Sequence, residues 1–412
     1  MTAGESFGSG LDQQLQSSQG QSEVELVMEE VTAGCWYAPG FANVGVVLTS
    51  EGVLVIDTSL SRRHAEQVRG WIRSRTDLAV KALVYTHGHF DHVNGADALA
   101  DADTRVIAHE NVPDRFRKYR ALHQHIERIN GIQFGRRTDG ERSFDFHFPD
   151  TTFHHEHEFR LGDKTIHLRH GRGETEDHCF VHVLEDDLIY CGDFFIWSFP
   201  NIGNPLKVVR FEREWFESLE QIRDLEPEFL VPGHGKALAG RAVIRQALQD
   251  VVDCLRLVHE HVIEHLNRGT SLEDMLQLIE VPPHLRDSPY VQQTYGSVDF
   301  AVRGTHRRYA GWFHDENPTH LDPCKAAEVC AEIAALLPSQ DVVIERARAL
   351  MSEGRHRMAL HLLDVLVLGS GHEEARRVKT DAVRACADAT DNFIAGNIYR
   401  QLADPLDSED EG

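Results

Sequence analysis

The stretch THGHFDH at residues 86–92 places four groups that can bind a metal ion within six consecutive positions: His87, His89, Asp91 and His92. It follows the apolar run ALVY and precedes a segment that is expected to begin a helix. Because the backbone turns sharply at a strand-to-helix corner, His87 and His89 can face one point while Asp91 and His92 reach a second point nearby. Imidazole and carboxylate ligands without thiolate favour zinc, with manganese or iron as alternatives. The stretch therefore predicts a site for two metal ions.

Two further residues stand where such a site needs additional ligands. Asp193 ends the apolar run LIYCGD, and His234 lies in the turn PGHG that follows EFLV. Functional side chains of layered folds gather at strand ends, so both residues can reach the 86–92 stretch. Asp193 is the candidate for the carboxylate that bridges the two ions, and Asp91 is assigned a catalytic role besides its role as a ligand. We predict two Zn²⁺ per chain, which would activate a water molecule for hydrolysis.

Composition restricts the partners of this site. The chain has 412 residues and a formal net charge of -24, which repels a phosphate backbone, so nucleic-acid binding is not expected. No stretch approaches the roughly 20 apolar residues of a membrane span. The seven cysteines are scattered without a C-x-x-C pair, and the first residues lack a signal peptide, so we expect a cytoplasmic protein with reduced thiols. A small anionic substrate is compatible with this charge, because bound cations determine the local field.

The elements that must position these residues change character along the chain. Short β-rich runs alternate with helical segments up to residue 240, interrupted by a basic, helical insertion between residues 111 and 150. The remainder is helical almost throughout, and its last helices fall into antiparallel pairs. We predict the following division: a polar tail at 1–22, a catalytic domain at 23–240, a helical extension and linker at 241–324, a helical-hairpin domain at 325–403 and an acidic tail at 404–412.

The pattern H-x-H-x-D-H, with a later bridging acid and a final histidine, resembles the metallo-β-lactamase superfamily. The resemblance implies an αβ/βα sandwich of two mixed sheets over about residues 30–240, so the fold class is α+β with an α-helical C-terminal domain. It also implies a third ligand for the first metal, supplied in most members by a histidine. Here Glu174 stands at that place, in the turn GETEDH. A glutamate there is similar to the alkyl-sulfatase branch, but Glu176 and His178 are alternatives in the same turn.

A second part of the chain resembles that branch. The motifs YG, AVRG and YAGWFHDENP between residues 295 and 318 are similar to the segment through which alkyl sulfatases enter their dimerisation domain. The helix pairs after Lys325 resemble that domain, which implies a homodimer. The likeness stops where those enzymes would begin a sterol-carrier-like domain, and no export signal is found. Long-chain detergent sulfates are therefore disfavoured as substrates.

Three residues after Asp193 are candidates to hold an anionic substrate. Asn201, Lys207 and Arg210 lie in the stretch NIGNPLKVVR, and cationic side chains match sulfate or carboxylate oxygens by charge and hydrogen bonding. The alternative, a solvated loop charge, stays open for Lys207 and Arg210. A run of histidines at residues 147–157 can be a metal patch or a solvated strand edge, and we favour the solvated strand edge. The isolated His109 is interpreted as an ordinary surface or core residue.

The function predicted from these residues is that of a dinuclear zinc hydrolase acting on a sulfate ester or a similar small anionic ester. A lactone or thioester hydrolase with the same metal site is the alternative within hydrolases, since fold does not determine chemistry. A helical assembly or binding module with a vestigial metal site is the alternative from another class. A two-iron redox relative is disfavoured, because no flavin-binding segment follows the catalytic domain.

Overall fold

The computed structural model describes residues 26–136, 144–315 and 317–408. The described residues divide into two compact units: residues 26–123 with 144–309, and residues 124–136 with 310–315 and 317–408. The predicted polar tail at 1–22 lies outside the described residues, as do the last four residues of the chain. No helix in the described ranges combines the length and the apolar character that a membrane crossing requires, and the cytoplasmic location stays a prediction.

The first sheet of the first unit has seven strands that lie in chain order. Neighbouring strands are antiparallel as far as the fourth and parallel from there on. The strands are β1 (Glu29–Thr32), β2 (Cys35–Ala38), β3 (Val44–Leu48), β4 (Val53–Ile56), β5 (Val80–Val84), β6 (Arg105–His109) and β7 (Thr151–Phe153). The central strands are rich in valine, isoleucine and leucine, which suit a sheet that is covered on both faces.

Helix α2 (Arg62–Arg75) makes the crossover that the parallel pair β4 and β5 requires. Its N-cap Ser61 accepts a hydrogen bond from the backbone N–H of His64, and Ala65, Val68 and Ile72 form its buried face. The spacing of these three residues places them on one side of the helix, which is why the sequence predicts an amphipathic helix here. The helix therefore covers one face of the first sheet.

The second sheet has six strands in the order β13-β12-β11-β10-β9-β8. All neighbours are antiparallel except β11 and β12, which are parallel. The strands are β8 (Glu156–Leu161), β9 (Lys164–His170), β10 (Cys179–Val183), β11 (Leu188–Gly192), β12 (Phe229–Pro232) and β13 (Leu238–Ala239). Helix α7 (Glu212–Asp224) makes the crossover between the two parallel strands.

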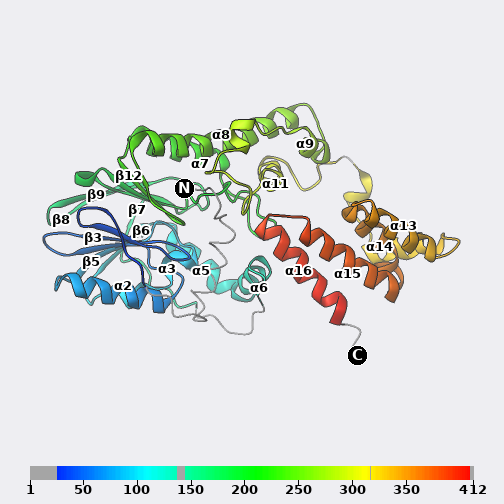
Figure 1. The fold of residues 1–412 in the computed structure, drawn as a ribbon, viewed down its shortest axis with the longest axis horizontal. Helices are drawn as coiled ribbons and strands as arrows, with labels where there is room; N and C mark the ends of the chain where they lie inside the picture. The colour runs from blue at the N-terminus through cyan, green and yellow to red at the C-terminus, as the bar shows by residue number, and fades with distance from the viewer. Residues whose placement is uncertain (1–25, 137–143, 316, 409–412) are drawn as a thin grey trace. The chain divides into compact units, whose positions relative to one another are not determined.

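Buried side chains separate the layers of the first unit. Val47, Leu54, Val181 and Tyr190 belong to a core between the two sheets, to which both sheets contribute. The other face of the second sheet packs against α7 and the long helix α8 (Arg241–Asn267), with Trp215 fully buried there. Figure 1 shows α2 and α8 on opposite sides of the sheets. The layers are therefore those of the predicted αβ/βα sandwich.

The remaining helices of the described chain differ in their packing. In the first unit, α9 and α11 pack on α8, whereas α3 and α4 follow β5 directly. Their bounds are α3 (Phe90–Val93), α4 (Ala96–Leu99), α5 (Val112–Ala121), α6 (His123–Gln133), α9 (Leu272–Leu278), α10 (Pro283–Arg286) and α11 (Val298–Tyr309). Helices α5 and α6 form the predicted insertion between β6 and β7. The C-terminal half of the chain thus contributes helices to both units.

The second unit contains the predicted helix pairs. They are α12 (Ala326–Ala335), α13 (Asp341–Ser352), α14 (His356–Ser370), α15 (Glu373–Asp388) and α16 (Phe393–Ser408). Leu350, Leu363, Leu366 and Val378 form part of their common core. Part of the insertion belongs to the same unit, because the Asn397 side chain donates a hydrogen bond to the carbonyl of Gln133 at 3.0 Å.

Candidate metal centre

The stretch 86–92 leaves β5 at its C-terminal end and turns into the short helix α3. Asp57, which follows the neighbouring strand β4, holds this turn with its carboxylate. The backbone N–H and the hydroxyl of Thr86 each donate a hydrogen bond to that carboxylate at 2.7 Å. Because Asp57 and Thr86 come from adjacent strand ends, the sheet itself determines where the histidines of the stretch begin.

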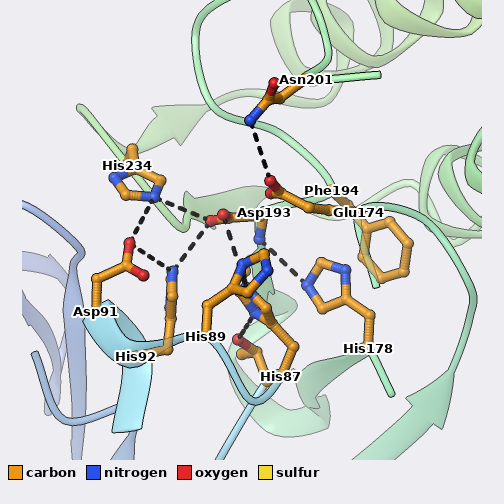
Figure 2. Close-up of polar contacts among 12 residues, drawn as sticks. His87, His89, Asp91, His92, Glu174, His178, Asp193, Phe194, Asn201 and His234 are labelled. Carbon is orange, nitrogen blue, oxygen red and sulfur yellow. Dashed lines mark hydrogen bonds and ion pairs between the residues drawn. The ribbon is translucent and has the colours of Figure 1, made fainter. Parts of the chain in front are cut away.

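The first group of candidate ligands consists of His87, His89, Glu174 and Asp193. Their ligand atoms all lie within 4.8 Å of one another. The Nε2 atom of His87 is 2.9 Å from Nδ1 of His89 and 3.7 Å from Oδ2 of Asp193. All four come from strand ends or from loops that leave the two sheets, as Figure 2 shows. Two imidazoles and two carboxylates at these separations suit a divalent cation such as zinc.

The second group consists of Asp91, His92 and His234, whose ligand atoms also lie within 4.8 Å of one another. Oδ2 of Asp91 is 3.4 Å from Nε2 of His234 and 3.5 Å from Nε2 of His92. Oδ1 of Asp193 lies 3.3 Å from the Nε2 atoms of both histidines. One oxygen of Asp193 therefore faces the first group and the other faces the second, which is the geometry of a bridging carboxylate (Figure 2).

The electrostatics of the two groups suit cations. Burial, together with nearby positive charges, lowers the pKa of His87 and of His89 well below the usual value, so both imidazoles are neutral and present lone pairs. Burial also opposes the charged form of His92, but the carboxylates around it outweigh burial and raise its pKa well above the usual value. The Nε2 atom of His92 and Oδ1 of Asp193 are buried without a hydrogen-bond partner among the described residues. Metal ions would satisfy these atoms, so the residues fit the predicted centre.

Outer hydrogen bonds orient the two histidines of the second group. Nδ1 of His92 lies 2.7 Å from Oδ2 of Asp57, and Nδ1 of His234 contacts the backbone carbonyl of Phe41. Both rings therefore direct Nε2 toward the group. Ligand histidines in metalloproteins are commonly held in this way, which determines the tautomer as well as the ring orientation.

The structure distinguishes among the three candidates for the third ligand in the turn GETEDH. Oε1 of Glu174 contacts the Arg210 guanidinium and accepts a hydrogen bond from Asn201 at 3.5 Å, whereas Oε2 is buried without a partner among the described residues. Glu176 pairs with Arg115 instead. The Nε2 atom of His178 accepts a hydrogen bond from the backbone N–H of Asp193 at 3.2 Å. Only Glu174 belongs to the first group of ligands.

Comparisons with known proteins agree with this architecture. Residues 37–234 match the family model of the metallo-beta-lactamase superfamily, and residues 271–409 match the model described as alkyl sulfatase dimerisation. The chain therefore contains a metallo-β-lactamase domain followed by an alkyl sulfatase dimerisation domain. Its two matched domains are those of the alkyl-sulfatase-like branch, so the predicted resemblance and the predicted α+β fold with a helical C-terminal domain are confirmed.

Individual relatives are alkylsulfatases. A linear primary-alkylsulfatase of a Pseudomonas species is 25% identical over 390 residues, with 88% of this chain and 73% of that protein covered. An (R)-specific secondary-alkylsulfatase of a Pseudomonas species is 22% identical over 402 residues, with 87% and 59% covered. The chain thus spans about three quarters of the first relative and less than two thirds of the second. The prediction of a metallo-β-lactamase-fold hydrolase is confirmed by these relatives.

A solved structure gives the same fold. The stereoselective inverting sec-alkylsulfatase Pisa1 from Pseudomonas sp. superposes with a TM-score of 0.82 at 21% identity, with 92% of this chain and 65% of that chain covered. The similarity extends beyond the metallo-β-lactamase domain into the C-terminal helices, because it covers nearly the whole chain.

The three predicted substrate-binding residues differ in burial and in contacts. Arg210 is buried beside Glu174, and burial lowers the pKa of its guanidinium to about 10. Asn201 is also buried and donates a hydrogen bond to Glu174. Lys207 is half-buried in the same loop. The structure therefore brings Arg210 and Asn201 to Glu174.

Sequence reasoning missed Asp177, which connects the two ligand-bearing loops of the metallo-β-lactamase domain. Its fully buried carboxylate accepts hydrogen bonds from the backbone N–H of Gly88 at 3.1 Å and from Nε of Arg115 at 3.0 Å. Gly88 lies between His87 and His89, whereas Asp177 lies in the turn that carries Glu174. The signal for this role is weak in sequence, since the partners are 89 and 62 residues away.

We expect Asp177→Asn to weaken metal binding and activity together by roughly 10- to 100-fold, the range for outer partners of metal ligands. The amide keeps the shape but removes the charge that faces the buried Arg115. Competition with a chelator measures the affinity, and Glu176→Gln is the matched control because Glu176 also pairs with Arg115 but is not bonded to Gly88. Equal losses in both variants would assign the effect to Arg115 rather than to the link between the loops.

Proposed function

We propose that this chain is a dinuclear zinc hydrolase that cleaves sulfate esters with a water nucleophile. The coarser statement, sulfate-ester hydrolysis by an enzyme of the metallo-β-lactamase fold, is supported by its alkylsulfatase relatives. The observation that carries the proposal is Asp193, whose two carboxylate oxygens face two separate groups of ligands. Zinc ions bound there would lower the pKa of a water molecule and polarise the ester.

The residues of the chain have separate tasks in this proposal. One ion would be held by His87, His89 and Glu174. The other ion would be held by Asp91, His92 and His234, and Asp193 would contact both ions. Asp91 is the more exposed carboxylate of the centre, with 17% of its side chain accessible against 6% for Asp193. Asp91 can therefore also orient the water from the solvent side and receive its proton, which is the catalytic role predicted for it.

Arg210 is the residue that we propose to orient the sulfate group. Its buried guanidinium already contacts a carboxylate oxygen of Glu174, so a cationic donor lies beside the first group of ligands. A planar guanidinium can donate parallel hydrogen bonds to two oxygens of a sulfate, which holds the ester in one orientation. Asn201 adds a neutral donor on the same side, and Lys207 stays a candidate for a more peripheral contact.

Metal content and substrate class test the proposal together. We expect the purified protein to contain two zinc ions per chain, to release inorganic sulfate from short alkyl sulfates, and to lose activity on chelation until zinc is restored. Plasma mass spectrometry measures the metal, and a panel of alkyl sulfates, lactones and thioesters measures the reaction. Hydrolysis of the lactones or thioesters alone would contradict the proposed sulfate-ester substrate. It would still be consistent with the proposed metal centre. Metal-free, inactive protein after zinc is supplied would refute the hydrolase.

We further propose that the second unit forms a homodimer, as the match to the alkyl sulfatase dimerisation model suggests. Helix α12 has the sequence AAEVCAEIAA, yet none of its residues is buried. Val329, Ile333 and the C-cap residue Leu336 are exposed at a spacing of four and three residues, which forms one apolar stripe. Apolar stripes of this kind on a described surface are commonly covered in an assembly.

Ile333→Asp is expected to shift the protein from dimer to monomer, because the charge would have to be buried in the interface. Sedimentation equilibrium measures the mass, and Glu332→Gln is the control on the same helix. A wild-type protein that stays monomeric at every concentration would refute the dimer, and an unchanged dimer in Ile333→Asp would exclude this stripe from the interface.

A further inference from the structure

A third group of metal-binding side chains lies outside the centre described above. His109 is the last residue of β6, Glu110 follows it, and His154 lies between β7 and β8. Their ligand atoms lie within 4.8 Å of one another, and the group shares no residue with the other two. His109 and His154 are 45 positions apart, so their combination could not be predicted from local spacing. The parallel pairing of β6 with β7 brings them together.

The orientation of His109 is the first observation that favours a site. Its side chain is buried, and its Nε2–H donates a hydrogen bond to the backbone carbonyl of His154 at 2.9 Å. Its ring also stacks on that of His170, with centroids 3.8 Å apart and planes 15° apart. A histidine that donates one N–H to a carbonyl keeps the lone pair of its other nitrogen for a metal.

The lone pair of His109 is available at neutral pH. Burial and the neighbouring His170 lower the pKa of His109 to about 4, so the imidazole is uncharged. Its Nδ1 atom accepts only one described hydrogen bond, from the backbone N–H of Asn111 at 3.3 Å. This distance exceeds the usual range for an N–H···O or N–H···N bond, so a metal ion would displace a weak contact.

Glu110 and His154 supply the exposed side of the group. Their side chains contact each other through a carboxylate oxygen and Nδ1, and 47% and 63% of the respective side-chain surfaces are accessible. The backbone between them is already fixed, because the N–H of Glu110 donates to the carbonyl of Phe153 at 3.0 Å. An ion could therefore enter from solvent, and only the two exposed side chains would need to move.

We propose that His109, Glu110 and His154 bind a divalent transition-metal ion such as Zn²⁺ or Cu²⁺, in addition to the ions of the catalytic centre. Two imidazoles and one carboxylate are the ligand types that these ions select. The ion would fasten the turn after β7 to the end of β6. The ion would also lie near the turn that carries Glu174. His170, which stacks on His109, donates a hydrogen bond from Nδ1 to the carbonyl of His178 in that turn at 2.9 Å. The role of the ion is therefore the stabilisation of this corner of the first unit.

Zinc stoichiometry in the full chain tests this site. Chelator-treated wild type, His154→Ala and His155→Ala are dialysed against the same buffered zinc solution, and bound zinc is measured by plasma mass spectrometry. The wild type is expected to retain one equivalent more than His154→Ala. His155→Ala is the matched control, because His155 is the exposed neighbour in the same turn and does not belong to the group. It should retain the wild-type amount.

Two further measurements complete the test. Glu110→Gln should also lose the additional equivalent, and zinc should raise the Tm of wild type and His155→Ala more than that of His154→Ala. Equal zinc contents in all four proteins, or the same loss in His155→Ala, would refute the site. The result is independent of the proposed function, because the catalytic centre is intact in every variant and its ions cancel in the comparison.

Discussion

Asp193→Asn is expected to lower kcat/KM by on the order of 10³-fold or more, above the 10- to 100-fold typical of outer-shell partners. The reason is that Asp193 belongs to both halves of the centre. Its Oδ2 lies 3.7 Å from His87, and its Oδ1 lies 3.3 Å from His92 and from His234. An amide keeps the size of the side chain but offers one acceptor oxygen and no charge, so it cannot bridge two cations.

The zinc content of Asp193→Asn is a second measurement of the bridging role, besides kcat/KM. The charges of His234 and His92 hold the pKa of Asp193 well below its usual range, against the opposing effect of burial. Removing the carboxylate should therefore reduce the bound zinc per chain as well as the rate. The control is Asp103→Asn, which makes the same change at an exposed position. Unchanged zinc content and activity in Asp193→Asn would contradict the bridging role.

Local spacing explains why most of the centre could be predicted from the sequence. His87, His89, Asp91 and His92 lie within one turn, so no knowledge of the tertiary fold is needed to group them. Asp193 and the two sheets could be anticipated because apolar runs that end in a polar residue mark strand ends. The fold then brings these ends together, as the order of the strands shows.

The residues that support the ligands could not be predicted in the same way. Asp57 contacts Thr86 and His92 only because β4 and β5 are parallel neighbours. Asp177 reaches Gly88 across two loops, and Arg115 reaches Asp177 from the insertion. These contacts depend on tertiary packing, which leaves no periodic pattern in the sequence. The same reason applies to His109 and His154, which the sequence analysis interpreted separately.

Burial distinguishes two cationic residues that spacing treats alike. Lys207 and Arg210 are equivalent candidates in sequence, since both are cationic and three residues apart. In the structure Arg210 is 5% exposed and contacts Glu174, whereas Lys207 is half-buried. A buried cation must be compensated by a nearby anion, and a ligand carboxylate provides this here. Arg210 is therefore held beside Glu174, where we propose that it orients the sulfate group.

Glu174→Gln is the second variant for which we expect a large effect, a loss of activity of at least about 10²-fold with lower zinc content, the upper end of what a supporting residue costs. Oε1 of Glu174 contacts Arg210 and Asn201, which leaves Oε2 buried and without a partner among the described residues. The amide would present an N–H group toward a cation or toward Arg210, and both orientations are unfavourable.

His178→Ala and Glu176→Gln distinguish the ligand from its neighbours in the same turn. The Nε2 atom of His178 accepts the backbone N–H of Asp193, and the ring stacks on Phe194 with centroids 4.0 Å apart. We therefore expect His178→Ala to lower the Tm while the zinc content per chain stays close to that of the wild type. Glu176→Gln should keep its zinc, because Glu176 pairs with Arg115 at the side of the centre. If Glu174→Gln retains full zinc while His178→Ala loses it, His178 rather than Glu174 is the third ligand. The first metal would then be held by three histidines, as in most members of the superfamily.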